Sequence, residues 1–179
     1  MLGRISSRLL YVCLGCTGLV AAAAAQNLPK PPSSAAPGDD GQWMMPAKNF
    51  ASTRYSELTE INTDNVKNLQ VAFTFSTGVN KGHEAAPLVV GTTMYIVSPY
   101  PNILYALDLA KPGAPMKWKF EPKPEPASQG VACCDVVNRG AVYADGRVFF
   151  NTLDNNTIAV DANTGKEIWR TKLAHTKQR

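Results

Sequence analysis

Short runs in which apolar and polar residues alternate fill the second half of the chain, which is the pattern of half-buried β-strands. Four such runs lie close together near the end of the sequence, at 141–143, 147–151, 157–161 and 166–170. They are separated by Asp145-Gly146, by 154–156 (Asp-Asn-Asn) and by 163–165 (Asn-Thr-Gly), which are strong turn signals. The spacing predicts an antiparallel four-stranded meander.

Similar runs occur earlier in the chain. Residues 87–90 and 92–97 flank Gly91, 103–107 follow a turn at Pro101-Asn102, and 70–75 alternate with Val71, Phe73 and Phe75 on one face. We expect a strand at each of these places. Residues 57–69 are the best helix candidate, with Leu58, Ile61, Val66 and Leu69 as the apolar positions. Because 62–65 reads as a break, two short helical turns fit this segment as well as one helix.

The strand unit is repeated. The second copy ends in Ala159-x-Asp161-x-x-Thr164-Gly165-Lys166-x-x-Trp169. The first ends in Ala106-x-Asp108, Gly113 and Trp118, with two more residues between Ala and Trp. An offset of about 50 residues matches a propeller blade, and a lone four-stranded sheet must stack on another to bury its faces. The first copy alone is weak enough to arise by chance in a β-rich chain, whereas the second is not.

Composition and charge limit the classes of protein to which the chain can belong. The 179 residues are 45% hydrophobic and 18% charged, as in an ordinary globular domain with a tail. The formal net charge is +4, and it falls to +2 without Arg4 and Arg8. Since the basic residues form no run and no basic helix face, we expect no nucleic-acid partner.

The first 25 residues are typical of a secretory signal peptide. Arg4 and Arg8 form its basic region, 9–20 are apolar, and 21–25 are small residues suited to cleavage. The apolar run is short for a membrane span, although an uncleaved anchor is the alternative. Cys13 and Cys16 form a C-x-x-C inside this run, so neither a redox nor a metal role is assigned to them. Residues 26–42 read as an N-terminal arm rich in Pro, Ser and Gly.

Cys133 and Cys134 are adjacent and are the two cysteines of the expected mature chain. Neighbouring Cα atoms lie about 3.8 Å apart, closer than an ordinary disulfide prefers, so a bond between them would close a small, strained ring. Such a ring closes a very short loop and would stabilise the fold little, but it would offer a rigid, flat sulfur surface. Two reduced, buried thiols are the other interpretation, and export to an oxidising compartment favours the disulfide.

Three segments together carry a resemblance to a known family. Residues 159–169, 130–140 and 82–90 resemble, in turn, the tryptophan-docking motif, the vicinal-disulfide segment and the Glu-bearing segment of the quinoprotein dehydrogenases. These are eight-bladed propellers that use pyrroloquinoline quinone (PQQ). The likeness extends over 43–172, and within the family 102–109 and 117–124 look most similar to methanol dehydrogenase large subunits, particularly the lanthanide-dependent branch.

The resemblance implies a fold and a set of site residues. The fold would be all-β, a partial β-propeller holding the first two to three blades. Cys133 and Cys134 would form the disulfide that stacks on the quinone, Glu84 would hydrogen-bond PQQ, and Arg139 would lie near its polar edge. From the residues alone, Glu84 could be a solvated turn residue and Arg139 could form a structural salt bridge to Asp135. His83 receives no functional role.

The function implied is that of a periplasmic PQQ-dependent primary-alcohol dehydrogenase that passes electrons to a cytochrome c, with Ca2+ or a lanthanide as its metal. Family members are far longer, and their metal ligands and catalytic Asp match nothing here. Residues 173–179 depart from the family, which we interpret as a truncation or a frameshifted tail. We therefore expect a chain that is soluble after signal cleavage and inactive alone; the resemblance also allows membrane association and a homodimer. A small exported β-repeat binding or scaffold protein is the alternative.

Overall fold

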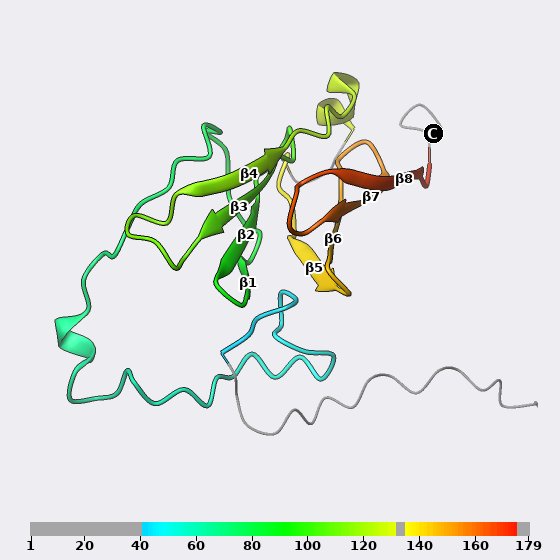
Figure 1. The fold of residues 1–179 in the computed structure, drawn as a ribbon. Helices are drawn as coiled ribbons and strands as arrows, with labels where there is room; N and C mark the ends of the chain where they lie inside the picture. The colour runs from blue at the N-terminus through cyan, green and yellow to red at the C-terminus, as the bar shows by residue number, and fades with distance from the viewer. Residues whose placement is uncertain (1–40, 132–134, 175–179) are drawn as a thin grey trace, which may run out of the picture. The chain divides into compact units, whose positions relative to one another are not determined.

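The computed structural model describes residues 41–131 and 135–174, which form two four-stranded antiparallel sheets. The first sheet holds β1 (Leu88–Val90), β2 (Thr93–Val97), β3 (Leu104–Asp108) and β4 (Met116–Phe120). The second holds β5 (Ala141–Ala144), β6 (Arg147–Asn151), β7 (Asn156–Asp161) and β8 (Glu167–Lys172). In each sheet the strands pair in chain order, so both are simple meanders (Figure 1). The predicted meander and its repetition are confirmed.

The same turn chemistry ends the third strand of each sheet. The Asp161 carboxylate accepts hydrogen bonds from the backbone N–H groups of Asn163 and Thr164, and Gly165 adopts a φ of 73° that an L-residue disfavours. In the first sheet, Asp108 accepts the N–H of Ala110 in the same way. The Asp and Gly positions of the repeated motif therefore shape the hairpins that precede β4 and β8.

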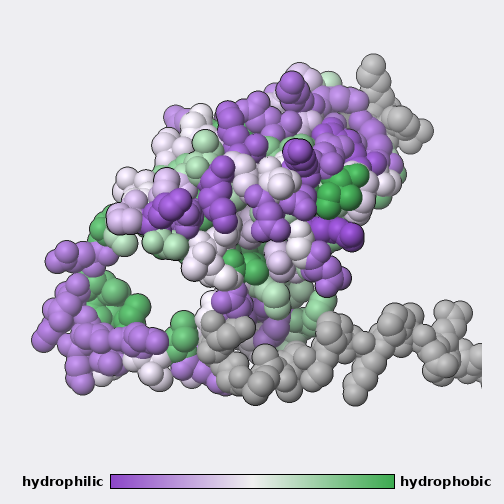
Figure 2. Space-filling model, viewed as in Figure 1, coloured by the Kyte–Doolittle hydropathy of each residue, from purple (hydrophilic) through white to green (hydrophobic). Residues whose placement is uncertain are grey.

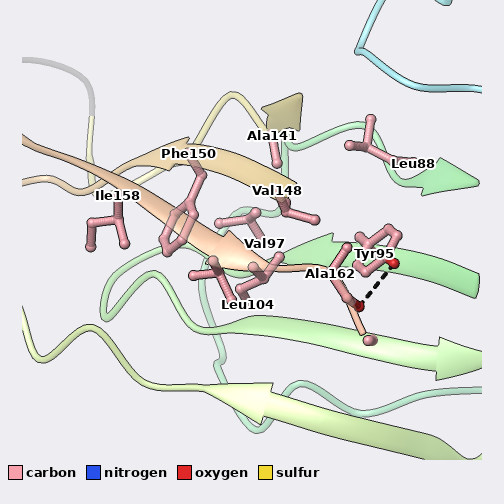
Figure 3. Close-up of a cluster of buried hydrophobic side chains, with 11 residues drawn as sticks. Leu88, Tyr95, Val97, Leu104, Ala141, Val148, Phe150, Ile158 and Ala162 are labelled. Carbon is pink, nitrogen blue, oxygen red and sulfur yellow. Dashed lines mark hydrogen bonds between the residues drawn. The ribbon is translucent and has the colours of Figure 1, made fainter. Parts of the chain in front are cut away.

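The two sheets pack face to face around one hydrophobic cluster (Figure 3). Val97 and Leu104 of the first sheet meet Val148, Phe150 and Ile158 of the second, and all are buried. Val97, Val148 and Phe150 alternate along β2 and β6 with more exposed positions, so one face of each of these strands is removed from water. Burial of an aliphatic or aromatic side chain stabilises the fold by roughly 1.5–3 kcal/mol each. The shared cluster is what makes the two blades a single folded unit.

Trp118 ties the first sheet to the hairpin turn of the second. Its indole Nε1 donates to the Ala162 carbonyl at 3.2 Å, and the Tyr95 hydroxyl donates to the same oxygen at 3.1 Å. The ring lies directly over Gly165, because a Cβ built at that glycine would come within 2.7 Å of two ring carbons. The predicted docking of the motif tryptophan on the neighbouring blade is therefore confirmed for Trp118.

Of the two interpretations offered for 57–69, the single helix is wrong and short helical turns are nearer to the structure. A single 3-10 turn, η1 (Val66–Asn68), follows the predicted break at 62–65, and the apolar residues of this segment are exposed. Residues 70–75 are not a strand, although Phe73 and Phe75 are half-buried and alternate with exposed neighbours. Among the described residues, no apolar surface lies against 57–69 that would stabilise a helix there. Likewise, no described strand pairs with 70–75 to form a ladder.

Within 41–131 and 135–174, no helix is both long enough and apolar enough to cross a membrane. A second 3-10 helix, η2 (Pro126–Gly130), lies in the connection between the sheets. The predicted signal peptide, most of the N-terminal arm and residues 175–179 of the tail lie outside the described residues.

Candidate functional site

Glu84 and Arg139, two of the predicted cofactor-binding residues, are brought together. Each lies a few residues before the first strand of its sheet, Glu84 before β1 and Arg139 before β5. The Arg139 guanidinium forms an ion pair with the Glu84 carboxylate, with 77% of the Arg139 side chain and 46% of the Glu84 side chain exposed. The alternative pairing of Arg139 with Asp135 is not the one that the structure shows.

The backbone brings these two side chains together because the segments before β1 and β5 run alongside each other. Ala86 and Gly140 form an isolated parallel bridge. Four residues earlier on one side, a Cβ placed on Gly82 would lie 3.7 Å from a Val137 methyl group. Gly140 has a φ of 109°, a conformation that favours glycine, whereas a Cβ there would make only ordinary contacts of 3.4–3.6 Å with Pro46 and Ala86.

The backbone on which Arg139 stands is fixed by its neighbours. The Tyr100 N–H donates to the Val136 carbonyl at 2.8 Å. The nearly buried Asn138 amide donates to the Asn151 carbonyl at 2.9 Å and accepts the Gly140 N–H at 2.9 Å. These hydrogen bonds hold the backbone around Arg139 in place, so that mainly side-chain freedom remains to be lost on binding. Asn138 therefore positions Arg139 and does not face outward as a ligand.

A second set of contacts fixes the start of the connection between β4 and β5, at Glu125. The Asp154 carboxylate accepts the Thr152 hydroxyl at 2.5 Å and the Glu125 N–H at 3.2 Å. Lys172 lies 3.8 Å from Asp154 and donates to Glu125 at 2.8 Å. Burial by itself would raise the pKa of the Asp154 carboxyl, but these hydrogen bonds and the Lys172 charge outweigh it, so the pKa lies below its usual range.

Sequence reasoning missed the structural roles of Asp154 and Asn138. Asp154 was recognised as a turn residue, which it is, but no local pattern indicates that its carboxylate reaches the chain 29 residues earlier. The role follows from burial of the carboxylate beside Thr152 and Asn156, and burial cannot be read from the local sequence. Cys133 and Cys134, the other two predicted site residues, lie outside the described residues.

The exposed ion pair offers both signs of charge on one anchored surface. A guanidinium fork suits carboxylates and quinone oxygens, and a carboxylate accepts hydrogen bonds from N–H and O–H groups. His83, next to Glu84, is engaged elsewhere: its ring nitrogens lie 2.8 Å from the Thr77 hydroxyl and 2.8 Å from the Lys81 carbonyl. The arrangement can therefore offer hydrogen-bond donors and an acceptor to a polar molecule, whereas the described residues around it add no nucleophile.

Comparisons with known proteins place this geometry in context. A profile of the PQQ glucose/ethanol/alcohol dehydrogenase β-propeller domain matches residues 43–171. A lanthanide-dependent methanol dehydrogenase of Methylacidiphilum fumariolicum is 57% identical over 136 residues, which cover 76% of this chain and 22% of that protein. Methanol dehydrogenase (cytochrome c) subunit 1 of Methylobacterium organophilum is 45% identical over 144 residues, covering 77% of this chain and 23% of that protein.

Among solved structures, a europium-containing methanol dehydrogenase superposes with a TM-score of 0.73 at 57% identity. The match covers 75% of this chain and 23% of that one. The chain thus spans about a fifth to a quarter of the length of the proteins it matches. The superposition confirms the predicted partial propeller.

Proposed function

The chain belongs to the PQQ-dependent glucose/ethanol/alcohol dehydrogenase β-propeller family, and on that premise we propose that it supplies one wall of a PQQ site in a periplasmic primary-alcohol dehydrogenase. The observation that carries the proposal is the exposed Glu84–Arg139 pair on the anchored segments before β1 and β5. The parent enzyme would oxidise methanol or a related alcohol and pass the electrons to a cytochrome c, as the names of the relatives suggest.

The residues present fit PQQ. Arg139 would hold a carboxylate or quinone oxygen of the cofactor, and Glu84 would accept a hydrogen bond from it. Their large exposed fractions leave both side chains able to turn toward a ligand, while Asn138 keeps the Arg139 backbone fixed. Cys133 and Cys134 would add the stacking surface as a vicinal disulfide. When bound, PQQ supplies the two-electron acceptor for the hydride of the alcohol.

We expect no alcohol oxidation by the chain alone. Neither Glu84 nor Arg139 is placed as a general base, and each already neutralises the other. The catalytic Asp and the Ca2+ or lanthanide ligands would come from further blades of a longer protein. Methanol turnover by the purified chain with PQQ and either metal would contradict this expectation.

PQQ binding to the 179-residue chain tests the site itself. Titration of PQQ, followed by its absorbance or by quenching of tryptophan fluorescence, should saturate, and Arg139→Gln should weaken binding by about tenfold, the usual loss for one charge-assisted hydrogen bond. Arg147→Gln is the matched control, since Arg147 is an exposed arginine on β6 outside the site. Equal PQQ affinities for Arg139→Gln, Arg147→Gln and the unmodified chain would refute the assignment of Arg139.

The cysteine pair is tested by intact mass after thiol alkylation without reductant. We expect no alkylated thiol on the mature chain, whereas two labelled thiols would exclude the disulfide. A folded chain that binds no PQQ would favour the alternative function, an exported β-repeat binding or scaffold protein. The observation on its side is that the two sheets already share a hydrophobic cluster without any further blade.

A further inference from the structure

Glu84 follows directly after a polar segment, residues 76–83, called here the 76–83 loop. Thr77 and Val79 are half-buried, and the other residues of the loop are exposed. Hydrophilic residues likewise make up most of the surface in the view of Figure 2. Gly78 and Gly82 add backbone freedom to the loop. Since burial orders this loop only weakly, the position of Glu84 depends on the hydrogen bonds that the loop makes.

His83 closes the loop on itself. Its Nδ1 lies 2.8 Å from the Lys81 carbonyl oxygen, and its Nε2 lies 2.8 Å from the Thr77 hydroxyl. Because a carbonyl oxygen can only accept a hydrogen bond, Nδ1 carries a proton and donates it. In the neutral ring, Nε2 is then an acceptor for the Thr77 hydroxyl. The imidazole therefore joins two points of the loop that flank Gly78, and it uses both of its nitrogens to do so.

Thr77 is in turn bonded to the first sheet. The hydroxyl of Tyr105, a buried residue of β3, donates to the Thr77 carbonyl at 2.7 Å, and the Tyr105 ring packs edge-on against Phe75. The Val79 N–H donates to the Thr77 hydroxyl at 3.3 Å. A hydroxyl that accepts from an N–H keeps its own proton for His83, in agreement with the ring tautomer. The contacts therefore continue from a buried residue of the sheet to His83.

Glu84 is thus held from both sides along the chain. On one side, His83 is bonded to the rest of the loop. On the other, Ala86 forms its bridge with Gly140. Glu84 lies between the two, and its carboxylate pairs with Arg139 although 46% of the side chain is exposed. Without the His83 contacts, the backbone before Glu84 would gain freedom, and the carboxylate would be ordered only by its partner.

We propose that His83 is a positioning residue of the PQQ site: by closing the 76–83 loop, it holds the Glu84 carboxylate where it can accept a hydrogen bond from the cofactor. This role deepens the proposed function and rests on it, because PQQ is taken as the ligand of Glu84. Both ring nitrogens of His83 are hydrogen-bonded within the loop, so neither is available to the cofactor. The imidazole acts on binding through the backbone that it orders.

Titration of PQQ into the unmodified 179-residue chain and its variants tests this role. His83→Ala should weaken PQQ binding about tenfold, because the freed loop must then be ordered when the cofactor binds. Thr77→Val removes the hydroxyl that pairs with the imidazole and should weaken binding to a similar degree, whereas Thr77→Ser keeps the hydroxyl and should restore the affinity. Thr157→Val is the matched control, since it also loses a 2.8 Å hydroxyl hydrogen bond, to Asn151, in the second sheet.

A double-mutant comparison with Glu84 separates positioning from a general loss of structure. If His83 acts through Glu84, then His83→Ala should cause no further loss of PQQ affinity in a chain that already carries Glu84→Ala. Circular dichroism and urea unfolding should show that the variants are folded, because no residue of the 76–83 loop belongs to the hydrophobic cluster. An equal loss of affinity with and without Glu84→Ala would contradict the proposal.

The hydrogen bonds of His83 are also tested without the cofactor. Nitrogen NMR of the neutral imidazole should place its proton on Nδ1, and a proton on Nε2 would overturn the loop contacts. PQQ binding that Arg139→Gln weakens and His83→Ala does not, in folded chains, would overturn the positioning role and leave the proposed site in place. An unmodified chain that binds no PQQ would overturn the proposed function and this role with it.

Discussion

Gly165 is the position at which a single added methyl group should do the most damage to the contact between the blades. A Cβ there would lie 2.7 Å from two carbons of the Trp118 ring, closer than non-bonded carbons approach. The ring cannot move away freely, because its Nε1 is bonded to the Ala162 carbonyl and its face packs against Tyr95. Gly165→Ala must therefore displace the tryptophan or the turn.

The loss of stability expected for Gly165→Ala has three parts. An alanine at a φ of 73° loses roughly 1–2 kcal/mol to backbone strain. Crowding in a packed contact costs typically about 1–3 kcal/mol. Loss of the indole hydrogen bond adds about 1 kcal/mol. Because these effects share one cause they will not add fully, and we expect a loss of about 3–4 kcal/mol in the free energy of unfolding, a large fraction of the stability of a small domain.

Gly113→Ala separates strain from crowding. Gly113 has nearly the same φ, 77°, and open space around it, so its alanine variant should lose only the backbone term of roughly 1–2 kcal/mol. Urea unfolding at low protein concentration, followed by tryptophan fluorescence and circular dichroism, gives both values from the shift in midpoint. Equal losses for the two variants would refute the argument that Gly165 is required by the docked ring.

Two further predictions concern the buried contacts between and within the blades. Because the pKa of Asp154 is lowered in the fold, its contribution to stability is complete above the ordinary aspartate pKa of about 3.9 and is lost as the pH falls through the lower folded value. Asp154→Asn should therefore lose about 1–3 kcal/mol at neutral pH, with the gap to the unmodified chain narrowing as the pH falls below about 4 in urea titrations; a gap independent of pH would contradict the charge argument. Trp118→Phe removes the Nε1 donor but leaves Ala162 bonded to Tyr95, so unfolding should be easier by about 1–2 kcal/mol, and a change within error would show that the indole bond contributes nothing.

The strands were predictable because their signals are local. The alternation along β6 and the Asp-Gly and Asn-Thr-Gly turns act within a few residues, and the structure follows them closely. The segments at 57–69 and 70–75 carry comparable patterns, but the first forms only the 3-10 turn η1 and the second forms no strand. An apolar pattern yields regular structure only when another surface covers it, and among the described residues no such surface is present for these two segments.

The residues of the candidate site were predictable from local motifs, whereas their contacts were not. Glu84 and Arg139 were identified from the motifs that contain them, but their contact depends on the isolated bridge between Ala86 and Gly140, which lie 54 positions apart in the chain. The hydrogen bonds of Asn138 and Asp154 could not be predicted from local sequence patterns. Asn138 bonds to a backbone group 13 residues away, and Asp154 to one 29 residues away. Long-range hydrogen bonds of this kind have no signature in the spacing of residues.

By itself the sequence determined the blade: four short apolar runs, the turns between them, and a tryptophan 10 or 12 positions after its alanine. Only the tertiary structure decided where each tryptophan goes. Trp118 is covered by the turn at 162–165, whereas Trp169 is partly exposed, although the two motifs have similar sequences. The physical reason is that a docking contact belongs to two surfaces at once, and a motif encodes only one of them; the other is supplied by whichever sheet packs against it.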